Sequence, residues 1–547
     1  MSIETAQDGE HRYDYVIVGG GSAGCVLAAR LSENPAIRVC LIEAGPRDRN
    51  PLIHIPLGVM RLINHPRLNW RYWSTPQQHV ADRAIYLPRG RVLGGSSSIN
   101  GSIYMRGHRA DYDDWAQWGN RGWSYAEVLP YFIKSENNEQ LSDSPYHGRG
   151  GPMNVTDLDS YNPLVEIMLA AADELQLPRN DDFNGKEQEG FGRRQVTIRR
   201  GRRESAATAF LRGARNRRNL TIVCNALVSR IVFDQRRATC VELIQNGKTR
   251  SVSARREIVL AAGTFASPAI LMRSGIGDGE SLRTFGIDVL HHAPQVGHNL
   301  QDHISAAVQY SSPTTMPYGL SWRSLPQLAW SVLQYPLLRR GLLANTILHA
   351  GGFVRFRPDL DRPDLQFILI PAERTPEGRV GIGHGYGLMT LLLRPRSTGI
   401  VTLAGRDPNL APVIDPRFYS EPEDLDDMVR GLRFARRVLE APAWKRVRGA
   451  ELRPGPEVQH DEELKTYIRT TSVTCFHPVG TCRMGPDAGD VVDAQLRVRG
   501  VEGLRVVDAS IMPRMIGGNT NAPVIMIAEK AVDMILGRPP LPAAADL

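Results

Sequence analysis

The sequence is poor in cysteine, with six in 547 residues and no two at the CxxC spacing of a redox or zinc motif. We therefore expect no disulfide framework, and we expect the protein to lie in a reducing, cytoplasmic compartment. Cys475 and Cys482 flank His477, but this spacing matches no usual zinc site, so we expect free thiols and no metal.

Long apolar runs are also lacking. No stretch reaches the roughly 18 to 20 apolar residues of a membrane-spanning helix, and the polar start of the sequence argues against a secretory leader. The most apolar segment, 325–350, is interrupted by Pro336, Arg339 and Arg340. We expect it to be helical and packed within a second domain, and contact with a membrane surface is the less favoured interpretation.

The charge balance is only mildly basic, with 66 Lys and Arg against 58 Asp and Glu. Much of the excess lies in short runs such as 199–203 and 215–218, which lack the interleaved aromatic residues that stack on bases. The pattern indicates a solvated basic surface and no nucleic-acid partner. Such a charge also favours the approach of an anionic cofactor or substrate.

The opening of the chain predicts a βαβ unit. Residues 13–18 (YDYVIV) are typical of a buried parallel strand, 25–31 of a helix, and 37–42 of the next strand. This order indicates an α/β fold with a Rossmann-type domain built on a parallel sheet. Further strands are predicted at 220–223, 226–233, 257–260 and 504–507. The predicted nucleotide-binding domain therefore comprises 12–155, 195–305 and 470–540, and 156–194 with 306–469 form a substrate domain with an antiparallel sheet and helices.

A phosphate-binding turn follows the first strand. Gly19, Gly21 and Gly24 form a GxGxxG motif that allows a tight turn, close approach of a pyrophosphate, and close packing of helix on strand. The helix N-terminus then offers free N–H groups to the phosphates. Glu43 lies 19 residues beyond Gly24, where a carboxylate can accept hydrogen bonds from a ribose. An ordinary glycine-rich turn with a surface glutamate explains this combination poorly, but the motif alone does not separate FAD from NAD.

Further motifs follow in order along the chain. They are 90–101 (GRVLGGSSSING), 263–277 (GTFASPAILMRSGIG), 475–482 (CFHPVGTC), 506–510 (VVDAS) and 517–523 (GGNTNAP). With the opening turn they resemble the glucose–methanol–choline (GMC) family of oxidoreductases over nearly the whole chain, from about residue 13 to 535. Within that family, Asn521 resembles the choline dehydrogenase and oxidase branch, and 16–45 resembles L-sorbose dehydrogenase.

The resemblance implies FAD between the two domains and oxidation of a primary alcohol to the aldehyde, with hydride transfer to flavin N5 and no metal. It also implies an electron acceptor, either a quinone, another carrier or O2. Some members attach FAD to a histidine of the 90–101 loop, where this chain has Ile99, so FAD is expected to be noncovalent. The residues assigned to FAD are Gly19, Gly21, Ser22, Ala23, Gly24, Glu43, Arg91, Gly94, Ser98, Asn100, Gly101, Val228, Asp508, Ala509 and Asn519.

The resemblance also makes His477 the catalytic base and Asn521 the second polar residue facing the flavin. An imidazole with a pKa of about 6.5 suits a base at neutral pH, and an amide has both a donor and an acceptor for the alcohol oxygen. Without the resemblance, both would be ordinary loop, core or helix-start residues. His291, His292, His298 and His303 are expected to belong to a loop that links the domains, not to a metal site.

The substrate is less defined than the reaction. His349, before Gly351 and Gly352, stands where choline-type members carry an acid that recognises a cation, so choline is disfavoured and sugars or polyols, aromatic and aliphatic alcohols stay open. His349, His477 and Asn521 are expected to contact the substrate. Two other functions also remain open: an FAD-containing lyase of the hydroxynitrile lyase type, and a redox-silent flavin-binding protein.

Overall fold

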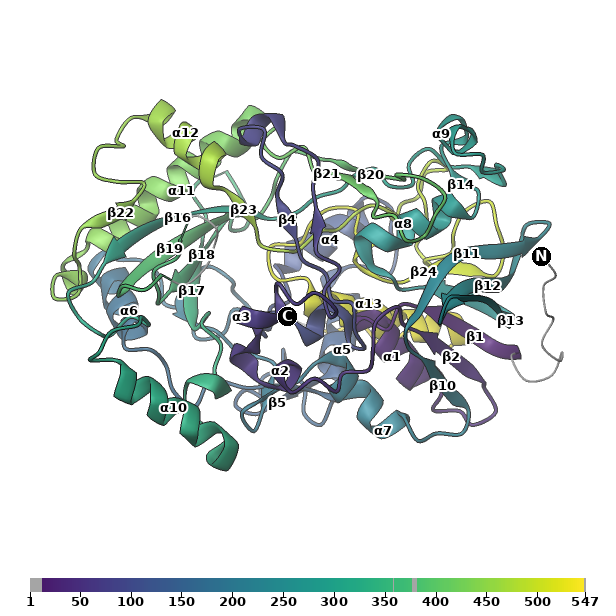
Figure 1. Cartoon of the computed structure of the whole chain (residues 1–547), viewed down its shortest axis with the longest axis horizontal. Coiled ribbons are helices and arrows are strands. Elements are labelled where there is room, and N and C mark those ends of the chain that lie inside the picture. The colour runs from purple at the N-terminus through teal and green to yellow at the C-terminus, as the bar shows by residue number, and fades with distance from the viewer. Residues whose placement is uncertain (1–11, 358, 376–380, 546–547) are drawn as a thin grey trace.

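The computed structural model describes residues 12–357, 359–375 and 381–545. Figure 1 shows two lobes, each built around its own large sheet. The helices are α1 (Ser22–Leu31), α2 (Pro51–His54), α3 (Val59–Leu62), α4 (Arg109–Gln117), α5 (Tyr125–Ser135), α6 (Leu164–Glu174), α7 (Arg212–Ala214), α8 (Gly263–Arg273), α9 (Gly279–Thr284), α10 (Leu325–Leu338), α11 (Pro422–Glu440), α12 (Asp461–Thr471) and α13 (Asn521–Leu536).

The first lobe contains the predicted Rossmann-type sheet, and its strand order is β10-β2-β1-β13-β12-β11, with β24 also paired to β13. These strands are β1 (Arg12–Val18), β2 (Val39–Ile42), β10 (Leu220–Val223), β11 (Ala226–Asp234), β12 (Arg237–Gln245), β13 (Lys248–Leu260) and β24 (Leu504–Val506). The central pairs β10–β2, β2–β1, β1–β13 and β13–β24 are parallel, and β12 and β11 extend the sheet antiparallel. Strands from the beginning, middle and end of the chain therefore meet in one sheet, as the pattern of apolar runs predicted.

Helix α1 packs on the centre of this sheet. It crosses from β1 to β2 and is packed in turn against α13, which is almost entirely buried. The parallel strands β1 and β2 are buried on both faces, which is why their sequences are continuous apolar runs. This arrangement brings the N-termini of α1 and α13 to the same region of the lobe.

The second lobe has an antiparallel sheet of order β22-β16-β19-β18-β17-β7, with β23 also paired to β16. These strands are β7 (Gly190–Arg193), β16 (Ile304–Ser311), β17 (Ala350–Val354), β18 (Leu365–Ile370), β19 (Gly385–Leu392), β22 (Glu451–Arg453) and β23 (Val473–Thr474). The amphipathic helix α11 packs on β16 and β19. Because β23 pairs with β16, the start of 470–540 belongs to the second sheet, and the predicted boundary lies a few residues too early.

The other strands form small two-stranded sheets. They are β3 (Tyr72–Trp73) with β4 (Tyr86–Leu87), β5 (Glu136–Asn138) with β6 (Met153–Val155), β8 (Ile198–Arg199) with β9 (Arg202–Arg203), β14 (Ile276–Gly277) with β15 (His291–His292), and β20 (Ile400–Thr402) with β21 (Val413–Asp415).

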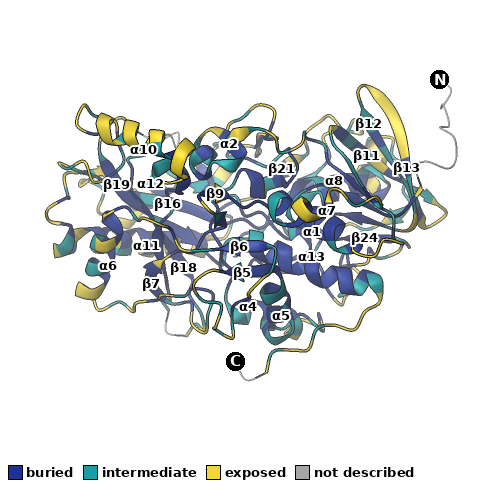
Figure 2. Cartoon of the chain, turned by 90° about the horizontal axis from the view of Figure 1, so that it is seen from below, coloured by how far each residue is buried: buried dark blue, intermediate teal, exposed yellow. Residues whose placement is uncertain are grey.

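The apolar segment at 325–350 is helical only as far as Leu338, and its predicted packing is wrong. Tyr335 is the one residue of α10 that is buried, and Figure 2 shows the helix mostly in the colour of exposed residues at one end of the molecule. Arg339 ends the helix in a left-handed conformation, with φ 56°. No helix within the described ranges is long and apolar enough to cross a membrane.

Candidate active site

A cavity of about 2000 Å³ extends between the two lobes. It is larger than the roughly 300–1,000 Å³ of ordinary small-molecule pockets, which leaves room for a dinucleotide together with a substrate. Its wall includes residues within 18–23, 42–44, 52–73, 83–103, 226–228, 261–273, 346–348, 408–412, 470–478 and 508–524, together with Ile368, Arg374 and Met389. Most of the residues assigned to FAD from the sequence therefore face a single space.

The phosphate-binding turn has the shape that a pyrophosphate needs. Gly21 is the N-cap of α1 and offers no side-chain cap, and the first turn of the helix has no acid, so its first N–H groups are available to an anion. A Cβ atom at Gly21 would meet nothing closer than 3.9 Å, so the backbone borders open space there. A Cβ atom at Gly24 would instead lie 1.9 Å from the Gly19 oxygen. Gly21, Ser22 and Ala23 line the cavity, whereas Gly24 allows the helix to pack.

Glu43 lies at the end of β2, at the edge of the cavity. Its carboxylate accepts hydrogen bonds from the N–H groups of Gly20 (2.9 Å) and Gly45 (2.7 Å). Burial raises the pKa of Glu43 to about 7, against the opposing effect of these two bonds. The carboxylate thus stabilises the turn, and its remaining lone pairs can accept hydrogen bonds from a ribose.

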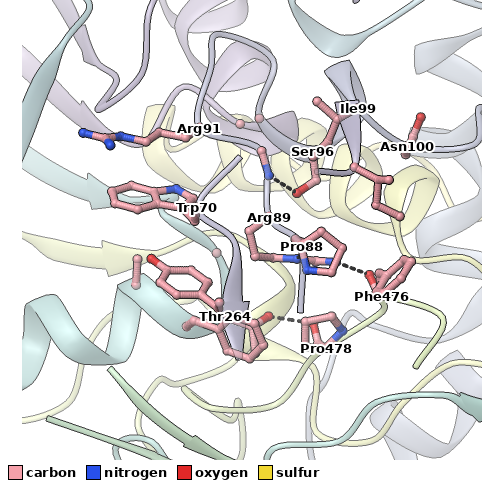
Figure 3. A pocket seen from close by; sticks show the side chains of 18 of the residues that line it. Trp70, Pro88, Arg89, Arg91, Ser96, Ile99, Asn100, Thr264, Phe476 and Pro478 are labelled. Carbon is pink, nitrogen blue, oxygen red and sulfur yellow. Dashed lines mark hydrogen bonds between the residues drawn. The ribbon is translucent and has the colours of Figure 1, made fainter. Parts of the chain in front are cut away.

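The glycine- and serine-rich loop contributes fewer contacts than expected. Ser98 is buried, donates to the Leu93 carbonyl (2.9 Å) and does not reach the cavity. Gly94 also lies off the wall, where its N–H donates to the Gly20 carbonyl (2.7 Å) and holds the loop against the turn. Ser96, which the sequence analysis did not assign, faces the cavity instead, and its Oγ accepts from the Gly90 N–H at 3.1 Å (Figure 3).

The neighbouring loop residues are placed as predicted. Arg91, Ile99, Asn100 and Gly101 all line the cavity. The Arg91 guanidinium lies 4.7 Å from the ring centroid of Trp70 (Figure 3), which fixes a cation beside the space for the cofactor.

The far wall is organised by Asp508. Its carboxylate accepts from the N–H of Gly263 (2.8 Å), the Ser267 hydroxyl (2.6 Å) and the N–H of Ser510 (2.8 Å). These bonds join the start of α8 to the segment after β24, and Ala509 and Val228 line the same wall. Asp508 therefore holds both segments in place, and the backbone next to it can contact a ligand in the cavity.

The backbone before His477 is held in an uncommon conformation. Phe476 has φ 66°, a left-handed value that a bulky residue rarely adopts without support. The support comes from Arg89, whose Nη2 donates to the Phe476 carbonyl at 2.5 Å (Figure 3), and from Thr474, whose hydroxyl accepts from the Phe476 N–H at 2.9 Å. Asp302 accepts from the His477 N–H at 2.8 Å. Together these bonds aim the imidazole into the cavity.

A chain of hydrogen bonds fixes the tautomer of His477. His303 Nε2 lies 3.2 Å from the Leu393 carbonyl, which can only accept, so Nε2 carries a hydrogen. His303 Nδ1 is then unprotonated in the neutral ring and accepts from His477 Nδ1, 3.0 Å away. His477 Nε2 is therefore unprotonated and lies on the cavity side, where its lone pair accepts a hydrogen bond from Asn519 Nδ2 at 3.0 Å. A base with its lone pair facing the substrate space is the result.

Both imidazoles are neutral at physiological pH. Burial lowers the pKa of His303 to about 4. The pKa of His477 is held well below 6.5, chiefly by burial, and the positive charges of Arg89 and Arg194 lower it further. A neutral, uncharged imidazole is the form that can accept a proton.

The structure replaces one predicted partner of His477 with another. Asn519, assigned above to the cofactor, lies beside the base, and its Oδ1 is buried without a hydrogen-bond partner. Asn521 instead accepts from the Ser22 hydroxyl at 2.7 Å, at the phosphate turn. The expectation that Asn521 sits beside the imidazole is therefore wrong by two positions, because α13 begins at Asn521 and directs it toward α1.

His349 does not reach the substrate space. It is fully buried, its Nδ1 accepts from the Asn162 N–H (2.9 Å), and its Nε2 donates to the Thr346 carbonyl (2.5 Å). With both nitrogens bound to backbone, it is a core histidine, and the predicted substrate contact is wrong.

The chemistry of the wall near the base is apolar and cationic. Glu43 and Asp508 are the acids among the described lining residues, and both lie on the first lobe. Arg89 and Arg374 line the cavity near the base instead. Within the described ranges, no three His, Cys, Asp or Glu side chains lie together as metal ligands would.

Sequence reasoning missed the contacts that prepare the base. His303 was placed in a linking loop, and nothing in its sequence neighbourhood shows that it meets a residue 174 positions away. Arg89 was not singled out either, although it directly precedes the glycine- and serine-rich loop.

Comparisons with known proteins show the family to which the chain belongs. Family models described as GMC oxidoreductase match residues 13–305 and 395–528. The chain is 44% identical over 527 residues to an alcohol dehydrogenase [acceptor] of Pseudomonas putida, covering 96% of both chains. It is 41% identical over 539 residues to the mitochondrial choline dehydrogenase of Homo sapiens, covering 97% of this chain and 90% of that protein.

Solved structures agree as well. Pyridoxine 4-oxidase from Mesorbium loti superposes with a TM-score of 0.87 at 34% identity, covering 96% of this chain and 100% of the other. A fungal aryl-alcohol oxidase superposes with a TM-score of 0.84 at 26% identity, covering 96% and 99%. The chain belongs to the GMC oxidoreductase family, whose FAD-dependent members act on CH–OH donors.

Proposed function

We propose that this chain is an FAD-dependent dehydrogenase that oxidises a primary alcohol to the aldehyde, with His477 as the general base. The observation that carries the proposal is the tautomer of His477, whose Nε2 lone pair lies on the cavity side because its Nδ1–H donates to His303 Nδ1. The bound FAD supplies the acceptor for the hydride that leaves the alcohol carbon.

The protein side of the reaction follows from the contacts. His477 Nε2 takes the hydroxyl proton, and the imidazolium that results keeps its Nδ1–H bond to neutral His303. Asn519 offers a donor and an unpartnered acceptor beside Nε2, which can orient the alcohol oxygen. Transfer of this proton to the histidine, together with loss of the hydride to the acceptor that FAD would supply, yields the aldehyde.

The wall favours an alcohol with an apolar body. Ile368, Met389 and Leu348 line the cavity and form a cluster that includes Cys475, two positions before the base. A cationic alcohol such as choline would meet arginines there, and no carboxylate near the base is among the described lining residues. Aliphatic or aromatic primary alcohols therefore fit better than choline or a sugar.

Two further features belong to the proposal. FAD binds noncovalently, because Ile99 stands where some family members attach the flavin through a histidine, and its side chain cannot form such a bond. A quinone or another carrier is favoured over O2 as the electron acceptor, because the P. putida relative is an alcohol dehydrogenase [acceptor]. Acid precipitation tests the first feature, because noncovalent FAD stays in the supernatant.

The decisive experiment is anaerobic mixing of the FAD-loaded protein with a panel of alcohols: aliphatic, benzyl-type, sugar and choline. Bleaching of the flavin by apolar primary alcohols, and its loss in His477→Ala, is expected. Admission of air then separates a dehydrogenase, which stays bleached, from an oxidase, which regains its colour and forms hydrogen peroxide. Absence of bleaching with every alcohol would overturn the proposal in favour of a lyase or a redox-silent flavoprotein.

A further inference from the structure

The surface around α10 exposes an unusual concentration of large apolar side chains. Among them, Trp322, Leu333 and Leu337 are 77%, 62% and 85% exposed. The whole set comprises Leu320, Trp322, Leu325, Trp330, Val332, Leu333, Leu337 and Leu338, and we call it the α10 surface. Single exposed apolar residues are ordinary, but a contiguous patch of this kind marks an interaction site.

The segment that carries this patch has charged side chains of one sign. No aspartate or glutamate occurs between Asp302 and Asp359, whereas Arg323, Arg339 and Arg340 flank the apolar residues and are exposed. No ion pair involving these three guanidinium groups occurs among the described residues.

A second segment adds to this positive charge. A Cβ atom on Gly201 would lie 2.0 Å from the Arg339 oxygen, so the β8–β9 hairpin packs directly against the C-terminal end of α10. Arg200 and Arg202 of the hairpin are exposed, and neither has a carboxylate partner within the described ranges. Five exposed arginines therefore border the α10 surface.

We propose that the α10 surface binds an anionic phospholipid bilayer, with α10 lying in the plane of the membrane. Leucine side chains would enter the acyl region, tryptophans would sit at the headgroup level, and the arginines would pair with lipid phosphates. At about 1.5 Å per residue, the 14 residues of α10 extend about 21 Å, less than the roughly 30 Å of a hydrocarbon core. The helix therefore lies on the bilayer and does not span it.

A second copy of this chain fits the surface less well. A two-fold dimer would place the patch against itself, and the arginines of one copy would face those of the other. An anionic bilayer supplies the missing negative charge over the whole rim.

The position of the surface connects the membrane to the cavity. The chain leaves α10 through a short 3-10 turn (Leu342–Ala344) and then forms the part of the cavity wall that includes Ile347 and Leu348. The Tyr335 hydroxyl also donates to the His54 carbonyl (3.2 Å) at the end of α2. Bilayer binding would thus bring an apolar substrate or a lipid-soluble acceptor close to the site, although the binding itself does not depend on the proposed reaction.

Flotation of the FAD-loaded full chain with vesicles tests the inference. Vesicles of phosphatidylcholine mixed with phosphatidylglycerol should bind the protein, vesicles of phosphatidylcholine alone should bind it more weakly, and high salt should release it. Leu333→Gln with Leu337→Gln should lower the partition coefficient about tenfold or more. Arg339→Gln with Arg340→Gln should lower it about fivefold per arginine.

Matched controls remove equivalent groups elsewhere. Trp118→Gln with Leu452→Gln takes away apolar side chains that are 45% and 40% exposed. Arg215→Gln with Arg218→Gln takes away two exposed arginines beside α7. Both controls should bind vesicles as the unmodified protein does, and all four variants should keep its activity with a soluble dye.

Three results would overturn the inference: no flotation with anionic vesicles, equal loss in the α10 and control variants, or a lipid-independent dimer that Leu333→Gln with Leu337→Gln dissociates. If that double variant fails to fold, the exposed Arg339→Gln with Arg340→Gln pair still decides the matter, because retained binding contradicts the role of charge.

Discussion

Replacement of His303 by phenylalanine should slow flavin reduction without abolishing cofactor binding. The phenyl ring preserves the volume, but His477 Nδ1–H loses its acceptor 3.0 Å away. A hydrogen bond to a charged group contributes about 1.5–3 kcal/mol, and the bond is charged only once His477 holds the substrate proton. The rate constant should therefore fall about 10- to 150-fold, at about 1.4 kcal/mol per tenfold.

The assay is stopped-flow reduction of the loaded enzyme under anaerobic conditions, at saturating alcohol. His303 does not line the cavity, so the apparent dissociation constant of the alcohol should change little. His303→Gln serves as the conservative variant, because its amide can accept from His477 and donate to the Leu393 carbonyl, and it should recover part of the rate. Unchanged reduction in His303→Phe, or equal losses of rate and thermal stability in both variants, would refute the positioning role.

The pH profile gives an independent view of the same pair. The pKa of His477 lies well below 6.5, so the base stays neutral as the pH rises from 6.5 and gains its proton only in more acidic solution. The value of kcat/KM should accordingly be flat above pH 6.5 and fall on the acid side with an inflection below 6.5. An inflection above pH 7 would contradict the effect of burial on this imidazole.

Further predictions concern the turn, the two asparagines and the core histidine. Gly21→Ala should leave the protein folded but weaken FAD binding about tenfold or more, since a methyl group forced against the pyrophosphate costs about 1–3 kcal/mol; Gly24→Ala, with its Cβ 1.9 Å from the Gly19 oxygen, should lower the yield of folded protein itself. Flavin-to-protein absorbance ratios and thermal melts separate the two, and equal FAD content in Gly21→Ala would disprove the first. In Asn519→Ala, flavin reduction should be about 10- to 100-fold slower. Asn521→Ala should instead lower the affinity for FAD and leave the reduction rate of the loaded enzyme unchanged. The reverse pattern would show that Asn521, and not Asn519, acts beside the base. The pKa of His349 is about 4 in the folded protein and about 6.5 in the unfolded chain, so the unfolded chain binds a proton that the folded protein does not. The free energy of unfolding should therefore fall as the pH drops from 6.5 to 4, by up to about 3 kcal/mol. His349→Gln should reduce this pH dependence in urea titrations and leave the KM for the alcohol unchanged, and an unaltered pH dependence would contradict the prediction.

Much of the first lobe could be predicted because its signals are local. Continuous apolar runs identified β1, β2, β10, β11 and β24, and the glycine motif was followed by a helix as predicted, although α1 begins at Ser22 and not at residue 25. The family motifs then placed most of the cofactor-facing residues on the cavity wall.

The errors arose where the outcome depends on contacts between distant segments. Asn519 and Asn521 have the same side chain, and only the start of α13 decides which faces His477 and which faces Ser22. His349 looked like a replaced acid, but two backbone partners hold it in the core. The cytoplasmic compartment stays a prediction.

The direction of the Leu393 carbonyl has a consequence for how this protein acquires its activity. His303 immediately precedes β16, and Leu393 immediately follows β19, two strands paired with Ser305 opposite Leu391. The tautomer of the base therefore depends on the register of an antiparallel strand pair that is not part of the phosphate-binding turn. A slip of one residue in that pair would move the carbonyl away and leave both histidines free to exchange tautomers. Folding to the active enzyme would then require two separate steps. Retention of flavin would report that the first lobe is folded, and turnover would report that β16 and β19 of the second lobe are paired in the correct register.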